Sequence, residues 1–233
     1  MSDIKCNLLK PFGSTILKSE LPDDLVKEFL DDLNTIRSSP EKTQGHQFGH
    51  RLAGNLYREL LVSHPVMLKW KQKYFDPLIV NYAVSHYEHK KVKQIIVTAS
   101  WHNIQKSGDF NPNHTHTHFE DRHISPDIST VGYLKLPKSM KDYKHSKEHH
   151  SVGGMIEFTE GTEDMFTNSN YLVEPITKDF YIFPSSLRHA VYPFYSDSET
   201  DERISFSFNA SLDRDWETCR NLLLLAQLNN LNL

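Results

Sequence analysis

Apolar residues change their spacing along the chain near residue 91. Before that point, an apolar stripe recurs at helical spacing in residues 22–33, behind a first turn rich in acids, and residues 54–91 show a similar period. Residues 8–17 predict a short strand broken by Pro-Phe-Gly, and residues 38–54 are polar and rich in turn residues, which indicates a loop. The first third of the chain is therefore expected to be largely helical.

After that point the pattern becomes that of strands. Residues 92–105 are rich in β-branched and aromatic side chains. Further short strands are predicted between turn residues, at 129–136, 153–159, 171–174, 179–183, 189–194 and 203–209. Such a series predicts a mainly β fold, an antiparallel sandwich or jelly roll with helices laid on one sheet. The tail, residues 216–231, predicts a closing helix with leucines on its buried side.

Composition narrows the class of protein. The chain of 233 residues is long enough for one well-buried core, and no stretch approaches the apolar length that a membrane span needs. Only Cys6 and Cys219 are present and no secretory signal is apparent, so we expect a reducing, cytoplasmic location without a disulfide framework. The net charge of −4 argues against a surface that coats nucleic acid, although a local basic patch stays open.

Histidine is the residue type that stands out, with 14 copies. Residues 111–118 read Asn-Pro-Asn-His-Thr-His-Thr-His, and alternate side chains of an extended segment point the same way. His114 and His116 can therefore present two imidazoles to one metal ion, and neutral imidazole is the commonest protein ligand for iron, zinc, copper and nickel. The competing interpretation is a solvated, histidine-rich loop. A second group of histidines lies in residues 145–150.

A second candidate binding site lies in residues 203–209. They read Arg-Ile-Ser-Phe-Ser-Phe-Asn, so polar and apolar side chains alternate completely. If the apolar face packs against helices, the polar face must line a cavity, where an unpaired arginine would be costly. Guanidinium binds a carboxylate through two parallel hydrogen bonds and Ser205 can add its hydroxyl, so Arg203 predicts an anionic ligand. The alternative is an ordinary ion pair of Arg203 with Asp201, Glu202 or another surface acid.

Together these pieces resemble the iron(II)- and 2-oxoglutarate-dependent dioxygenases, especially the prolyl-hydroxylase-like branch and a 2OG-Fe(II) oxygenase subgroup often found in phage genomes. The resemblance covers roughly residues 101–209. Its elements are Asn103, Gly-Asp-Phe-Asn-Pro at 108–112, His114-x-His116, Val-Gly-Tyr-Leu at 131–134, Gly-Gly-Met-Ile-Glu-Phe at 153–158, Phe-Pro-Ser at 183–185 before His189, and Arg203-x-Ser205. It implies a double-stranded β-helix, a cupin-like jelly roll. We expect one domain, with an N-terminal strand and supporting helices in 1–91, the β core in 92–210 and a C-terminal helix in 211–233.

The resemblance also implies roles for particular side chains. Two histidines would bind iron and four polar side chains would bind 2-oxoglutarate. They are His114 and His189 in the first group, and Arg203, Ser205, Tyr133 and Asn103 in the second.

The third iron ligand is where the chain departs from the family pattern. The family uses the Asp or Glu of a His-x-Asp/Glu pair, but position 116 is histidine. Three interpretations stay open: His116 itself, the literal pair His118-x-Glu120, or Asp127 from further along the chain. His116 is favoured because Asn-Pro stands immediately before the pair and the family pattern resumes at Asp127, which makes residues 117–126 an insertion.

The reaction implied by the resemblance is hydroxylation, with Fe(II) as cofactor, 2-oxoglutarate as cosubstrate and O2 as oxidant. The substrate is expected to be a peptide side chain, with a small molecule or a nucleobase as alternatives. Two other classes compete with this interpretation. A cupin-like, three-histidine metal dioxygenase would not use 2-oxoglutarate, and a non-catalytic, metal-containing binding module would show closed zinc coordination.

Overall fold

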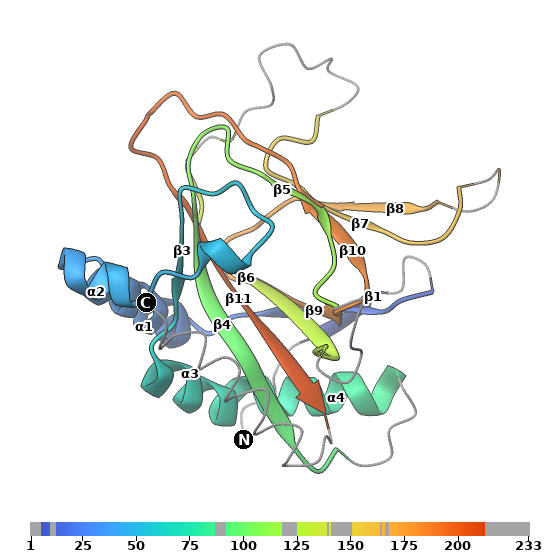
Figure 1. The fold of residues 1–233 in the computed structure, drawn as a ribbon. Coiled ribbons are helices and arrows are strands. Elements are labelled where there is room, and N and C mark those ends of the chain that lie inside the picture. Colours follow the sequence, from blue (N-terminus) through green and yellow to red (C-terminus); the bar gives the residue numbers. More distant parts are fainter. Residues whose placement is uncertain are drawn as a thin grey trace.

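The chain folds around two antiparallel sheets (Figure 1). The computed structural model describes residues 6–9, 13–86, 92–117, 125–138, 140, 151–163, 165 and 168–212. Within these residues, the larger sheet has the strand order β1 (Cys6–Leu9), β2 (Ile16–Glu20), β9 (Asp179–Pro184), β6 (Ile128–Lys135), β11 (Arg203–Leu212), β4 (Ile95–Gln105) and β3 (Arg58–Leu61). The smaller sheet has the order β5 (Asn111–His114), β10 (Arg188–Val191), β7 (Ile156–Thr159) and β8 (Asn170–Val173). This arrangement is the predicted double-stranded β-helix.

Helices cover one face of the larger sheet (Figure 1). They are α1 (Asp23–Ile36), α3 (His64–Trp70), a π-helical turn (Lys71–Phe75) and α4 (Asp76–His86). Their contact with the sheet is aromatic, since the ring of Phe29 lies 4.6 Å from that of Phe206 and the ring of Phe75 lies 4.8 Å from that of Phe208. Large aromatic side chains bury much apolar area, so these contacts fix the helices against the sheet.

The opposite face of the larger sheet turns toward the smaller one. Tyr133 and Phe183 from the larger sheet share a buried apolar cluster with Phe158 from the smaller sheet. Because successive strand residues point to opposite faces, Phe206 and Phe208 meet the helices while Arg203 and Ser205 line a cavity between the sheets. The complete alternation of residues 203–209 predicted this division.

The predicted strands of the β core are confirmed, with bounds that shift by a few residues. Two predictions for the first third were wrong. The expected loop contains the short helix α2 (Pro40–Gly45) and a 3₁₀ turn, η1 (Gly49–Arg51), because the Ser39 side chain accepts a hydrogen bond from the Lys42 N–H at 3.2 Å. The expected all-helical segment 54–91 begins with β3, which pairs with β4 at the sheet edge. The predicted tail helix lies outside the described residues.

Candidate metal centre

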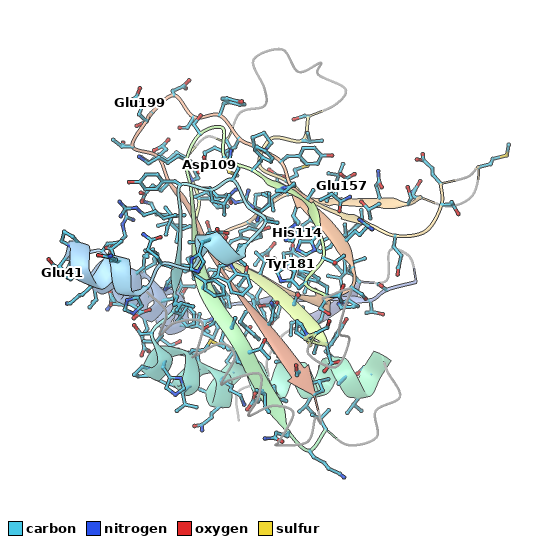
Figure 2. The ribbon with its side chains drawn as sticks, viewed as in Figure 1. Glu41, Asp109, His114, Glu157, Tyr181 and Glu199 are labelled. Carbon is cyan, nitrogen blue, oxygen red and sulfur yellow. The ribbon has the colours of Figure 1, made fainter. Side chains whose placement is uncertain are left out.

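Two neighbouring strands of the smaller sheet bring three histidines together. His114 ends β5 and is the direct cross-strand partner of His189 in β10. His116 follows two residues after β5, where its backbone N–H donates to the carbonyl oxygen of Ser185 at 2.9 Å. One ring nitrogen from each imidazole lies within 4.8 Å of the other two. Figure 2 labels His114, which projects toward the space between the sheets.

Burial keeps the three imidazoles neutral. Burial, reinforced by the neighbouring His114, lowers the pKa of His116 to about 3, and burial also lowers the pKa of His189 well below its ordinary value. The Nδ1 of His114 lies 2.7 Å from the carbonyl oxygen of Pro112, and the Nδ1 of His189 lies 2.9 Å from that of Leu187. A carbonyl only accepts, so both Nδ1 atoms carry the proton and both Nε2 atoms keep a lone pair. That is the form of imidazole that binds a metal.

His116 is held by side chains instead. Its Nδ1 lies 3.0 Å from the amide nitrogen of Asn209, whose oxygen accepts a hydrogen bond from the Ser129 hydroxyl at 2.9 Å. Its Nε2 lies 3.3 Å from the Nε2 of His189, and its ring stacks on that of Trp101 at 6.0 Å between centroids. If the Asn209 amide turns over, its oxygen accepts the Nδ1–H of His116, and Ser129 can then accept from the amide nitrogen. His116 would then offer Nε2 as the other two histidines do.

Arg203 lies in the same cavity, which has a volume of about 1050 Å³. The side chain is 1% exposed, and its Nη1 donates to the carbonyl oxygen of Gly154 at 2.7 Å. Buried donors around it have no hydrogen-bond partner among the described residues: the Nε of Arg203 itself, the hydroxyl of Tyr133 and the amide nitrogen of Gln105. The guanidinium lies 5.1 Å from the centre of the Tyr133 ring, and Gln105 stands directly opposite Arg203 on β4. Buried donors without partners indicate a place for an anionic ligand.

The acids that could have paired with Arg203 or served as the third metal ligand lie elsewhere or have other partners, where the structure describes them. Glu202 forms a two-armed ion pair with Arg37, with both contacts at 2.8 Å, and no described acid pairs with Arg203. Asp127 is exposed, and its carboxylate accepts a hydrogen bond from the Leu212 N–H at 2.7 Å. The pair His118-x-Glu120 and the second histidine group, residues 145–150, lie outside the described residues.

The remaining predicted cosubstrate contacts also line the cavity. Ser205 is 3% exposed and lies between Asn103 of β4 and Tyr133 of β6 in the sheet. The amide of Asn103 is already engaged, because its oxygen accepts from the Trp101 indole N–H at 3.0 Å and its nitrogen donates to the Ser207 hydroxyl at 3.1 Å. Asn103 therefore orients the indole of Trp101, while its predicted contact with the cosubstrate stays a prediction.

Four side chains of the cavity were given no role from the sequence. Asn209 stands at a cavity-facing position of β11, so the alternation that selected Arg203 could have found it. Gln105 lines the cavity from β4, two residues after Asn103, which the family resemblance had selected. Trp101 is the first residue of the family resemblance. Glu59 had no such signal, because its strand was predicted to be helical.

A family model with the description "Putative 2OG-Fe(II) oxygenase" matches residues 99–209. Over these residues the chain is similar to the family of iron- and 2-oxoglutarate-dependent oxygenases. The match contains His114, His116, His189 and Arg203. The donors present fit the two groups that the family uses, since three neutral imidazoles converge on one point and buried donors without partners surround a guanidinium in the same cavity.

Two solved structures illustrate the fold that this chain shares with known proteins. A prolyl-4-hydroxylase from Pseudomonas putida is 15% identical with a TM-score of 0.55, over 84% of this chain and 91% of that chain. HygX from Streptomyces hygroscopicus, with nickel, 2-oxoglutarate and hygromycin B bound, is 12% identical with a TM-score of 0.53, over 86% of this chain and 83% of that chain. No curated protein matches the chain. No helix in the described part of the chain has the length and apolar character that crossing a membrane requires.

Proposed function

We propose that this oxygenase binds Fe(II) through His114, His116 and His189, anchors 2-oxoglutarate on Arg203, and hydroxylates a peptide side chain or a small molecule. The observation that carries the proposal is that three imidazole nitrogens within 4.8 Å of one another line the same cavity as a buried guanidinium that no described acid pairs with. These are the two binding elements that the family's chemistry requires.

Each proposed residue has a separate task. The carbonyls of Pro112 and Leu187 hold two imidazoles in the form with a free Nε2, which fixes their orientation toward the metal. Arg203 presents its guanidinium to the distal carboxylate of 2-oxoglutarate, and the hydroxyls of Tyr133 and Ser205 add donors beside it. We assign Gln105 to the same group, because its amide nitrogen is unpartnered and it stands opposite Arg203.

The metal supplies the chemistry that these side chains lack. When bound, ferrous iron activates O2 and couples the decarboxylation of 2-oxoglutarate to succinate with oxidation of the substrate. The protein positions the two small molecules and encloses them between two sheets. A peptide substrate is favoured by the similarity in fold to the Pseudomonas prolyl-4-hydroxylase, and a small molecule by the similarity to HygX.

The test measures first the binding of 2-oxoglutarate and then its conversion to succinate. Protein loaded anaerobically with Fe(II) is titrated with 2-oxoglutarate, and succinate is then measured after O2 is added, with and without candidate substrates. Arg203→Ala should lose 2-oxoglutarate binding while keeping the metal. His116→Ala removes a direct ligand, so metal affinity should fall by more than the roughly ten- to a hundredfold that loss of an outer-shell partner costs. The matched control is Arg188→Ala, which removes an exposed arginine from β10.

Three outcomes separate the competing functions. Binding of 2-oxoglutarate that depends on Arg203 supports the proposal. Metal-dependent oxygen consumption that is indifferent to Arg203→Ala would instead support a three-histidine enzyme that does not use 2-oxoglutarate. Tight zinc binding without any 2-oxoglutarate binding would support a binding module.

A further inference from the structure

Glu59 is a buried acid on the wall of the cavity. It lies in β3, directly across from Asn103 of β4, and both side chains line the cavity. Cross-strand partners in an antiparallel sheet point to the same face, so the Glu59 carboxyl is directed at the space between the sheets. The side chain is 4% exposed. A Cβ at Gly49 would lie 3.0 Å from its Oε2, so the η1 turn closes against the carboxyl.

Glu59 differs from the other buried acids because its carboxyl has no partner in the described structure. Asp32 accepts hydrogen bonds from the Ser63 N–H at 3.1 Å and approaches the His102 ring at 3.2 Å. Asp179 pairs with Lys18 at 2.7 Å. Burial alone raises the pKa of Glu59 to about 7, because no described cation or donor acts on the carboxyl. A buried acid without a partner is costly, which indicates that a ligand supplies the partner.

Two aromatic rings line the same cavity as this carboxyl. The backbone N–H of Phe48 donates to the backbone carbonyl of Glu59 at 2.9 Å, and the Phe48 ring lies 5.5 Å from the Trp101 ring. Both rings line the cavity. A carboxylate beside aromatic faces is the chemistry that binds an ammonium or guanidinium group, since the ring quadrupole and the negative charge both attract a cation.

Trp101 links this wall to the histidine cluster. Its ring stacks on that of His116 at 6.0 Å, and its indole N–H is held by Asn103. The carboxyl of Glu59, the indole of Trp101 and the three imidazoles therefore all line one cavity. A cation held at Glu59 would therefore lie in the same cavity as the histidines.

We propose that Glu59, with the rings of Phe48 and Trp101, binds the basic nitrogen of the substrate, so that the natural substrate carries an ammonium or guanidinium group. The assignment of this group to the substrate rests on the proposed oxygenase function. The binding of a cation by this wall of the cavity does not depend on turnover.

The test compares cations with neutral molecules of the same shape. The probes are the Nα-acetyl methylamides of lysine and norleucine, and those of arginine and citrulline. Each is titrated calorimetrically into the full chain loaded with Mn(II) and 2-oxoglutarate, and into the metal-free chain. Wild type should bind at least one cationic probe at least about tenfold more tightly than its neutral counterpart. Glu59→Gln should remove that preference, and Phe48→Leu should reduce it about threefold.

Glu59→Gln preserves the size of the side chain, and Glu163→Gln controls for the loss of one negative charge, because Glu163 is exposed. Equal binding of charged and neutral probes to wild type, no binding of either cation at millimolar concentration, or an unchanged preference in Glu59→Gln would each overturn the assignment. The 2-oxoglutarate titration of the same wild-type sample is read separately. Its failure would reject the proposed oxygenase function, while an absent cation preference beside intact 2-oxoglutarate binding would reject only the role of Glu59.

Discussion

The carboxyl of Glu59, which has no partner in the described structure, should make the free energy of unfolding of the ligand-free protein depend on pH. Burial raises its pKa from 4.5 to about 7. Between these pH values, the folded state keeps a proton that the unfolded state has already released. The stabilisation that this proton provides is therefore complete below about pH 4.5 and is lost as the pH rises through 7.

The size of this change in the free energy of unfolding follows from the shift in the pKa of Glu59. Each tenfold change in a proton-binding constant is worth about 1.4 kcal/mol, so the shift of Glu59 corresponds to a loss of about 3 kcal/mol across this range. The glutamine of Glu59→Gln cannot ionise, so this variant should not lose that stabilisation as the pH rises. The free energy of unfolding of the variant, relative to wild type, should therefore rise by about 3 kcal/mol between about pH 4.5 and about pH 8.

Urea unfolding followed by tryptophan fluorescence measures this difference, with metal and 2-oxoglutarate absent from all samples. Other titrating groups cancel in the comparison, since wild type and variant share them. Glu163→Gln, at an exposed position, reports any general effect of removing one charge. Parallel pH profiles for wild type and Glu59→Gln would refute the reasoning, because they would mean that the carboxyl of Glu59 is solvated or paired.

Three further substitutions test the packing and the candidate site. Gly132→Ala should destabilise the fold by about 1–3 kcal/mol in urea unfolding, because the new methyl group would overlap the ring of Phe206, and Phe206→Leu in the same chain should recover part of the loss. Asp32→Ala should cost about 2–4 kcal/mol, read as a lower Tm, because it leaves the fully buried His102 without its partner, whereas Asp32→Asn should cost less. Asn209→Leu should weaken Fe(II) binding about tenfold or more by calorimetry while leaving the Tm of the metal-free protein within a few degrees; unchanged affinity would remove Asn209 from the site.

The β core was predictable because its strands carry their pattern locally. In β11 the polar residues Arg203 and Ser205 alternate with Phe206 and Phe208, and a period of two allows only one division between cavity and helices. The helix α2 was also signalled, by serine followed by proline at its start, but the polar composition of the segment outweighed that signal.

β3 could not have been found in the same way. Its four residues, Arg-Glu-Leu-Leu, favour a helix, and they form a strand because β4 offers an edge from a distant part of the sequence. Because the segment was predicted to be helical, a candidate functional residue was overlooked. A helical Glu59 would have counted as one more surface acid, whereas the same residue in a strand opposite Asn103 faces the cavity.

The replacement of a carboxylate by His116 changes what the rest of the site must provide. His114 and His189 each donate to a carbonyl two residues earlier, so their protonation pattern is set by the local backbone. His116 relies on a side chain from the other sheet, Asn209, whose amide can either donate or accept. We therefore expect metal affinity to depend on residue 209 more than on any neighbour of the other two histidines. Three neutral ligands also leave the full charge of the ion in the cavity, so the anionic 2-oxoglutarate should contribute more to holding Fe(II) than in relatives with a carboxylate ligand, and the two should bind with strong positive cooperativity.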